Sequence, residues 1–259
     1  MSEDNLELDL LTNLEKIDIS KLGGLHVVPM YNIYGHLDTP YLISRFAGRS
    51  EDDSLWLSFY SEYPDESKDF SATGQFFKFG EEWRSFIYNK VHSLHGGNHK
   101  KIQKRRSDLK NAIAQALNEP NIRKAGLLIH ALGDSYAHTK GKLNTAEETA
   151  YGEIIGHGLA SICFHDPDKA FRISNRDKYI EFITELFELL KTENADEVKF
   201  RNYVNQVKGA SCTKDDCAID ELNLVAEHKK IHNFLFDNLH TIPSIQEEEL
   251  LNAFSLIQD

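Results

Sequence analysis

The chain has 259 residues, of which 41% are hydrophobic and 27% are charged, as is typical of a soluble globular protein. Its 41 acidic residues outnumber its 29 basic residues and give a formal net charge of −12, which argues against binding nucleic acid mainly through phosphates. The longest nearly apolar run, 125–132, is far too short for a transmembrane segment. Because the length is close to the size at which single cores stop growing, we expect 1–259 to form a single helical domain.

The N-terminus and the cysteines both favour a cytoplasmic protein. The first residues lack the basic and apolar regions of a signal peptide, although this leaves open export by a signal-independent route. Three cysteines, Cys163, Cys212 and Cys217, are too few for a disulfide framework and fit a reducing compartment. We expect Cys212 and Cys217 to be ordinary loop thiols, because no second pair is present to complete a zinc site with them.

Apolar residues recur at helical spacing along most of the chain, which predicts an all-α, compact multi-helix protein. In chain order, helices are expected over residues 6–17, 41–47, 55–63, 81–88, 109–117, 121–138, 147–164, 177–190, 195–207, 219–239 and 245–256. Thr39 and Pro40 should start the second of these helices, Gly48 should end it, and Pro64 should end the third. The basic run 100–106 is interpreted as a solvated loop or helix face.

The helix expected over 121–138 carries three ionisable residues on one face. His130, Asp134 and His138 follow one another in steps of four, each step advancing about 6 Å along the helix axis. The two histidines are therefore about 12 Å apart along the axis, too far to share one ion comfortably. The two oxygens of the Asp134 carboxylate could instead bridge two ions. Apolar neighbours argue against a water-exposed face, so the spacing predicts a multinuclear metal site.

Other segments supply further ligands of suitable type. Imidazole and carboxylate groups together suit Zn²⁺, and they occur at His36, Asp65, His92, His95, His157, His165, Asp166 and Asp168. A single histidine such as His157 is more often a hydrogen-bonded packing residue, but here its context favours a ligand. His228 and His232, by contrast, lie in a charged stretch, and we interpret them as solvated.

Four segments within 30–170 resemble a bacterial family of uncharacterised function that is similar to the zinc-dependent phospholipase C and single-strand nuclease superfamily. They are 35–48, in which Gly48 follows His36 by twelve residues; 61–66, with Asp65; 92–96, H-S-L-H-G; and 128–138, H-x-x-x-D-x-x-x-H, followed by Gly156-His157 and 165–168. The order and spacing of these motifs carry the resemblance. The C-terminal helices expected within 177–256 contain no matching motif.

The resemblance implies a domain of the zinc-dependent phospholipase C type with two or three zinc ions. One ion would be surrounded by Asp65, His92, His130 and Asp134. His138 and His157 would hold another ion, bridged by Asp134, and His36 would serve a third. Ser161 stands where the superfamily carries a carboxylate ligand, so the second ion would be held more weakly. The remaining candidates, which would contact ligands instead of ions, are His95, His165 and Asp168.

The resemblance further implies hydrolysis of phosphoric ester bonds in a lipid or nucleotide substrate. Asp65 would be the catalytic residue, because it would both touch zinc and orient the attacking water. An apolar cleft is expected to be lined by Tyr31, Tyr34, Trp56, Tyr60 and Tyr63. The first alternative is a zinc-binding structural or effector-like interaction protein without hydrolytic activity, and the second is a helical bundle without metal. A coordination position open to water would favour the enzyme, whereas a closed site would favour the structural role.

Overall fold

The computed structural model describes residues 33–67, 69–71, 81–152 and 170–258, and this part of the chain is mostly helical. The expectation of a compact, mainly α-helical protein is confirmed for these residues; the helix expected over 6–17 lies outside them. The helices are η2 (Tyr34–Asp38), α2 (Thr39–Phe46), α3 (Glu51–Glu66), α5 (Glu81–Phe86), η3 (Ile87–Val91), α6 (His99–Asn118), α7 (Ile122–Ala137), α9 (Ile173–Leu190), α10 (Glu197–Gly209), α11 (Asp215–Glu221), α12 (Val225–Leu239) and α13 (Glu247–Ala253). Of these, η2 and η3 are short π-helices.

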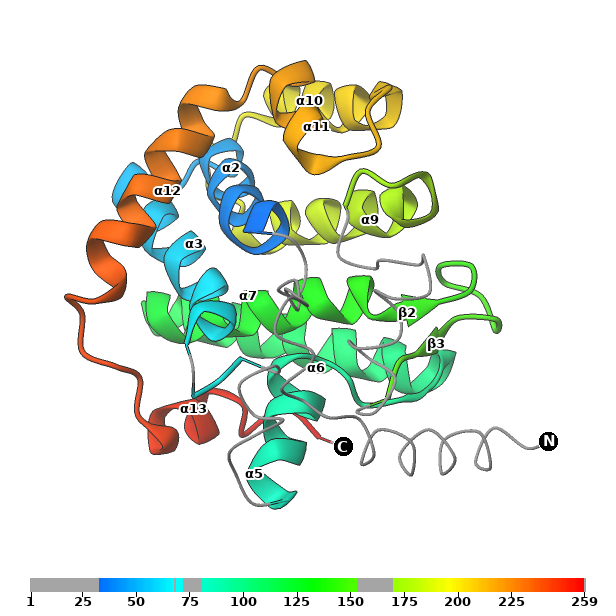
Figure 1. The fold of residues 1–259 in the computed structure, drawn as a ribbon, viewed down its shortest axis with the longest axis vertical. Coiled ribbons are helices and arrows are strands. Elements are labelled where there is room, and N and C mark those ends of the chain that lie inside the picture. The colour runs from blue at the N-terminus through cyan, green and yellow to red at the C-terminus, as the bar shows by residue number, and fades with distance from the viewer. Residues whose placement is uncertain (1–32, 68, 72–80, 153–169, 259) are drawn as a thin grey trace, which may run out of the picture.

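Helix α7 runs through the middle of the molecule (Figure 1) and packs against α3, α6 and α9. It begins where the sequence predicts, because the Asn121 side chain accepts a hydrogen bond from the backbone N–H of Lys124 at 3.0 Å and so caps the first turn. Every residue from Ala125 to Ala137 is buried. Polar side chains in this stretch must therefore find partners inside the protein.

Two glycines allow close packing around α7. A Cβ atom on Gly126 would lie 2.5 Å from Cβ of Tyr60 and 2.9 Å from the carbonyl oxygen of Leu57, so a larger residue would push α3 and α7 apart. A Cβ atom on Gly133 would lie 3.2 Å from Cε1 of His36. The missing side chain at Gly133 therefore lets the His36 ring approach α7 beside Asp134.

Buried tyrosine hydroxyls fix the segment that contains η2 and the start of α2. The Tyr203 hydroxyl of α10 lies 2.8 Å from the hydroxyl of Tyr34 and 2.8 Å from that of Tyr179 in α9. Thr39 Oγ1 donates to the carbonyl of Tyr34 at 2.8 Å. Tyr34, Tyr60 and Tyr63 have exposures of only 1%, 7% and 6%. They are core residues, so the expectation that they line a cleft is wrong; Tyr31 lies outside the described residues.

Several helix boundaries differ from the sequence prediction. Helix α3 starts at Glu51 because Ser50 accepts a hydrogen bond from the Asp53 N–H at 3.0 Å, and it continues through Pro64 to Glu66. The single helix expected over 219–239 is two helices, α11 and α12. Asn223 between them has φ +58°, a left-handed conformation that interrupts an α-helix.

The start of the segment expected to be helical over 147–164 is instead extended. Strand β3 (Thr149–Ala150) pairs antiparallel with β1 (Gly97–Asn98) and with β2 (Thr139–Lys140). Residues 153–164 of that expected helix lie outside the described part of the chain. The small sheet joins the end of α7 to the start of α6.

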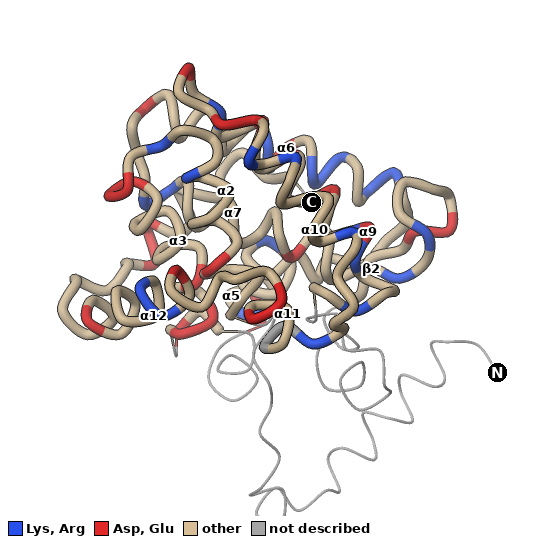
Figure 2. The backbone as a smooth tube through the Cα atoms, turned by 90° about the horizontal axis from the view of Figure 1, so that it is seen from above, with Lys and Arg blue, Asp and Glu red and all other residues tan. Residues whose placement is uncertain are grey.

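The basic run lies at the start of α6, along which Figure 2 shows Lys and Arg at close intervals. Its interpretation as a solvated face is wrong for Arg105 and Arg106, which are each only 2% exposed. Arg106 donates to the Glu148 carboxylate at 2.7 Å and to the carbonyl of Ser135 in α7 at 2.8 Å. Arg106 therefore fastens the C-terminal half of α7 to α6 and to Glu148, the residue before β3.

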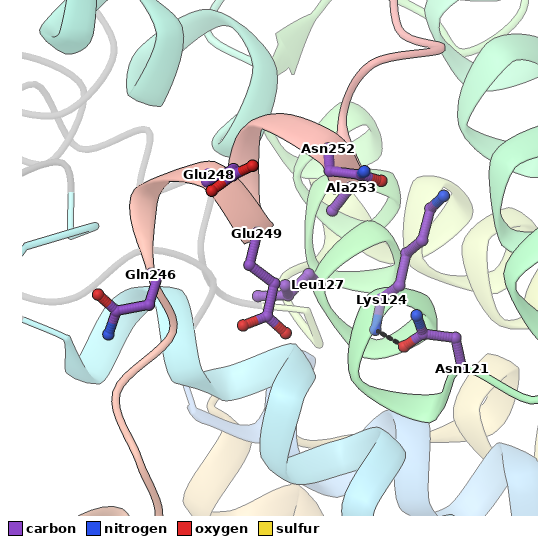
Figure 3. A pocket seen from close by; sticks show the side chains of 8 residues that line it. All are labelled: Asn121, Lys124, Leu127, Gln246, Glu248, Glu249, Asn252 and Ala253. Atoms are coloured by element: carbon purple, nitrogen blue, oxygen red, sulfur yellow. Dashed lines mark hydrogen bonds between the residues drawn. The ribbon is translucent and has the colours of Figure 1, made fainter.

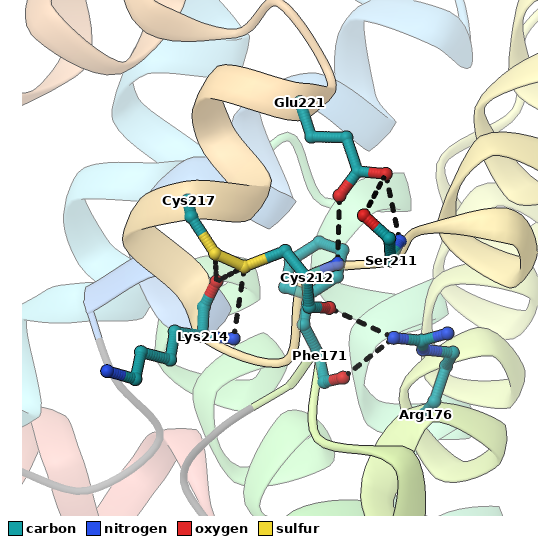
Figure 4. The surroundings of a disulfide bond; sticks show 7 residues. All are labelled: Phe171, Arg176, Ser211, Cys212, Lys214, Cys217 and Glu221. Carbon is teal, nitrogen blue, oxygen red and sulfur yellow. Dashed lines mark hydrogen bonds between the residues drawn. A yellow bond between two sulfur atoms is a disulfide. The ribbon is translucent and has the colours of Figure 1, made fainter.

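Cys212 and Cys217 form a disulfide (Figure 4), with their Cα atoms 6.0 Å apart. The expectation of two free loop thiols is thus wrong, and a disulfide is more typical of an oxidising compartment than of the cytosol. Arg176 supports this loop by donating to the carbonyls of Cys212 at 3.1 Å and Phe171 at 3.0 Å.

Among the described helices, none combines the length and apolar character needed to cross a membrane.

Candidate metal centre

The structure brings together six of the seven residues predicted to bind metal. His36 comes from η2, Asp65 from α3, and His130 and Asp134 from α7. The other two, His92 and His138, directly follow η3 and α7. The side chains of all six are between 0% and 2% exposed. The seventh residue, His157, lies outside the described residues, as do His165, Asp166 and Asp168.

The carboxylate of Asp134 is the centre of this cluster, because its two oxygens face different pairs of imidazoles. Oδ1 lies 2.9 Å from Nε2 of His36 and 3.7 Å from Nε2 of His138. Oδ2 lies 3.2 Å from Nδ1 of His92 and 3.3 Å from Nε2 of His130. Asp134 thus has the two-sided position that the four-residue spacing predicts, although Oδ1 is closer to His36 than to His138.

Main-chain carbonyls fix the orientation and tautomer of three of the rings. Nε2 of His92 lies 2.9 Å from the carbonyl oxygen of Phe70, and Nδ1 of His130 lies 2.8 Å from that of Ser61. Nδ1 of His138 lies 2.7 Å from the carbonyl of His92. A carbonyl can only accept, so each of these nitrogens carries the proton. In a neutral ring the other nitrogen is unprotonated, and in all three residues that nitrogen faces Asp134.

The charge of the cluster follows from its burial. Burial lowers the pKa of His92 and of His130 to about 4, and both rings are therefore neutral at pH 7. Burial would raise the pKa of Asp134, but the surrounding imidazoles, with His138 first, outweigh this and hold it well below its ordinary value. The cluster at neutral pH thus combines the Asp134 carboxylate with the neutral imidazoles of His92 and His130.

This arrangement fits a cation better than it fits a hydrogen-bond network of its own. Nδ1 of His92 and Nε2 of His130 are 3.0 Å apart. Both nitrogens carry lone pairs, because the proton of each neutral ring is on the other nitrogen, which donates to a carbonyl. Both also face the negatively charged Oδ2 of Asp134, so three acceptors converge without a proton between them. A positive ion relieves this repulsion, and imidazole and carboxylate are common ligands of divalent metals.

Two sets of ligand atoms are close enough to hold a metal ion. Asp65, His92 and His130 form one set, and His36, His130 and Asp134 form the other; within each set the ligand atoms lie within 4.8 Å of one another. Oδ1 of Asp65 is 3.8 Å from Nδ1 of His92. His130 belongs to both sets, which places them side by side. These groups could hold a metal ion, whose identity the geometry leaves undefined.

The carbonyls of Ser61 and Phe70 are the functional groups that sequence reasoning missed. No sequence signal could have identified them, because every residue carries a carbonyl. His95 was expected to contact the ligands, but its Nδ1 lies 2.6 Å from the carbonyl of Gly96. Within the described part of the chain, the charges that act on the His95 ring are those of Arg105, Lys101 and Arg106, and none belongs to the six residues.

A pocket of about 440 Å³ lies between the start of α7 and helix α13 (Figure 3). Its lining includes Asn121, Lys124 and Leu127 of the α7 region and Glu249 of α13. Lys124 and Asp134 are ten residues apart on the same helix, or about 15 Å along its axis. This pocket is therefore separate from the candidate metal centre.

The C-terminal histidines are not solvated as predicted. Nδ1 of His228 lies 2.9 Å from Oδ1 of Asp38, and Nε2 of His232 lies 3.4 Å from Oδ2 of the same carboxylate. The side chains of the two histidines are 29% and 18% exposed, and that of Asp38 is 2% exposed. The charged sequence of α12 suggested solvation because the partner lies far away in the chain.

Comparison with protein-family models, with curated proteins and with solved structures finds no match to this chain. The resemblance to zinc-dependent phospholipases and nucleases is thus a prediction carried by the sequence motifs.

Proposed function

We propose that the chain is a zinc-dependent hydrolase of phosphoric ester bonds with a domain of the zinc-dependent phospholipase C type. The observation that carries the proposal is the convergence of the His92 and His130 lone pairs on the Asp134 carboxylate inside the protein. The ligand types favour zinc, and the order of the motifs along the chain resembles the phospholipase and nuclease superfamily. The substrate would be a phosphoester of a lipid or a nucleotide.

The described residues would divide the work of such a site between them. Asp134 would bridge two ions, because its two oxygens face separate pairs of imidazoles. Main-chain carbonyls hold the rings of His92 and His130 in the ligating tautomer. Bound zinc ions supply Lewis-acid activation of water and neutralise charge on the phosphoryl group. Asp65 contributes the second carboxylate beside His92 and would accept a hydrogen bond from the attacking water.

The test is hydrolysis of bis(p-nitrophenyl) phosphate by zinc-loaded protein, measured together with zinc content. Asp134→Asn keeps the shape of the side chain but removes its charge, so we expect it to lose zinc and at least about 100-fold in turnover. Asp65→Asn should keep part of the zinc and lose turnover. Asp108→Asn, the same change at the partly exposed partner of Lys104 in α6, should behave like the wild type. Hydrolysis that neither Asp134→Asn nor Asp65→Asn affects would refute the assigned site.

One observation favours a second candidate, a zinc-binding structural or interaction protein. All six side chains are at most 2% exposed, and structural zinc sites are closed to solvent. On this alternative the protein binds zinc and is stabilised by it, but hydrolyses neither phosphodiesters nor phosphomonoesters. Zinc binding combined with turnover that depends on Asp65 would exclude it.

A further inference from the structure

A second group of metal-ligand side chains lies where α12 packs against η2. His228 and His232 are one helical turn apart in α12, and their ring centroids are 3.8 Å apart. Both rings face the carboxylate of Asp38, with Nδ1 of His228 at 2.9 Å from one oxygen and Nε2 of His232 at 3.4 Å from the other. One ligand atom from each residue fits within 4.8 Å of the others. This group is called the α12 cluster below.

Two carboxyl groups, those of Asp38 and Glu62, are buried in this part of the protein. Asp38 is almost fully buried, and an isolated buried carboxylate is costly unless it is paired or coordinates a cation. Glu62 of α3 is also buried, and its Oε2 has no hydrogen-bond partner among the described residues. Burial first, and then the charges of Glu66, Asp38 and Asp134, raise the pKa of Glu62 well above its ordinary value, so this carboxyl favours its neutral form and the charge at the site is that of Asp38.

One of the two lysines between the histidines in sequence order, Lys230, is paired with another residue. Its partner is the exposed carboxylate of Glu51 at the start of α3. The buried carboxylate of Asp38, by contrast, faces two imidazoles, a combination of ligand types that suits a divalent cation.

We propose that Asp38, His228 and His232 bind a divalent transition-metal ion, at a site separate from the centre around Asp134. Two histidines spaced i, i+4 on one helix present two nitrogen ligands on the same face, and a carboxylate from another element completes a set that suits zinc and its neighbours. The two histidines are partly exposed, so solvent can supply a further ligand. The ion fastens α12 to η2, the segment that also carries His36. This inference does not depend on the proposed hydrolase activity.

Zinc content of the full chain tests the proposal. The protein is loaded with excess zinc, desalted and measured by elemental analysis for the wild type, His228→Gln/His232→Gln and Asp38→Asn. We expect each variant to hold one zinc ion fewer than the wild type. His240→Gln, at an exposed histidine just after the end of α12, is the matched control and should hold as many as the wild type. Equal zinc content in the wild type and the double variant would overturn the proposal and leave a simple ion pair with Asp38.

Two further measurements keep the test independent of the buried centre and of variant folding. The Asp134→Asn protein should still bind one zinc ion, and the double variant Asp134→Asn/His228→Gln should bind none. A zinc ion that remains in the double variant would contradict the site at the α12 cluster without contradicting the centre around Asp134. In unaltered protein, zinc should protect His228 and His232, but not His240, from modification by diethyl pyrocarbonate, read by mass spectrometry. Equal modification of His228 and His232 with and without zinc would also overturn the proposal.

Discussion

Nδ1 of His92 and Nε2 of His130 lie 3.0 Å apart in the buried interior, while the other nitrogen of each ring donates to a main-chain carbonyl. Two neutral imidazoles held in this way cannot share a proton, because each contributes a lone pair to the gap between them. The negatively charged carboxylate of Asp134 faces the same gap. This relationship between two histidines is the physical reason to expect a metal ion there.

Removal of metal should therefore destabilise the protein. A metal ion that binds only the folded state adds about 2.7 kcal/mol to the free energy of unfolding when its free concentration is 100 times its Kd. We expect excess EDTA to lower the melting temperature of the wild type, and Asp134→Asn to lose most of this shift. Asp108→Asn should respond to EDTA as the wild type does. A wild-type melting temperature that EDTA leaves unchanged would contradict the metal centre.

The close approach of α3 and α7 should make Gly126 intolerant of a side chain. Gly126→Ala places a methyl group 2.5 Å from Cβ of Tyr60 and 2.9 Å from the Leu57 carbonyl, so we expect a loss of about 1–3 kcal/mol in the free energy of unfolding. Gly209, the last residue of α10, has nothing within 4 Å of the added atom, and Gly209→Ala should be neutral or stabilising. Urea denaturation of both variants measures the difference, and equal stability would argue against the tight contact.

The buried ion pair of Arg106 and Glu148 should matter far more than an exposed pair on the same helix. Arg106→Met removes the guanidinium partner of the buried Glu148 carboxylate. The carboxylate keeps hydrogen bonds from the Asn144 N–H and Thr139 Oγ1, so the loss should be about 3 kcal/mol, the lower end for breaking a buried ion pair. Lys104→Met breaks the exposed pair with Asp108 and should cost at most about 1 kcal/mol.

The double variant Arg106→Met/Glu148→Leu should recover part of the loss, because it removes both charges. Urea denaturation again provides the measurement. A double variant less stable than Arg106→Met would show that Glu148 contributes mainly through its other hydrogen bonds, from the Asn144 N–H and Thr139 Oγ1.

His95 should contribute to the loss of stability in acid. Burial, with a smaller effect of the charge on Arg105, lowers the pKa of His95 to about 4, below its unfolded value of about 6.5. The unfolded chain thus binds the proton first, and the stability present above about pH 6.5 is lost as the pH falls toward 4. Between pH 7 and pH 5, the free energy of unfolding of His95→Gln should fall by about 2 kcal/mol less than that of the wild type. Urea denaturation in EDTA at both pH values measures this, and equal losses would place the His95 ring in water.

The central helix and its ionisable face were predictable from the sequence because the information is local. Apolar residues at helical spacing and the cap at Asn121 define α7, and steps of four place His130 and Asp134 on one face. The continuation of α3 through Pro64 was not predictable in the same way. Local propensity favours a helix end at proline, and the buried surface of α3 that outweighs it depends on distant residues.

Long-range partners explain most of the other differences. Asp38 and His228 are 190 residues apart in sequence, and the charged pattern of α12 gives no sign that two of its histidines face a buried carboxylate. Arg106 is buried because Glu148, 42 residues away, offers a buried carboxylate to it. Binary patterns of polar and apolar residues predict which face of a helix is buried, but they do not identify the partner that compensates a buried charge.

The zinc content of the purified protein tests the central claim most directly. Protein prepared without chelators is measured by elemental analysis, for the wild type, for Asp134→Asn and for the control Asp108→Asn. We predict at least two zinc ions per chain in the wild type and in Asp108→Asn, and fewer in Asp134→Asn, because its carboxylate faces both groups of imidazoles. A wild-type protein without zinc or a comparable transition metal, or an Asp134→Asn protein with the full wild-type content, would contradict the assignment of the metal centre.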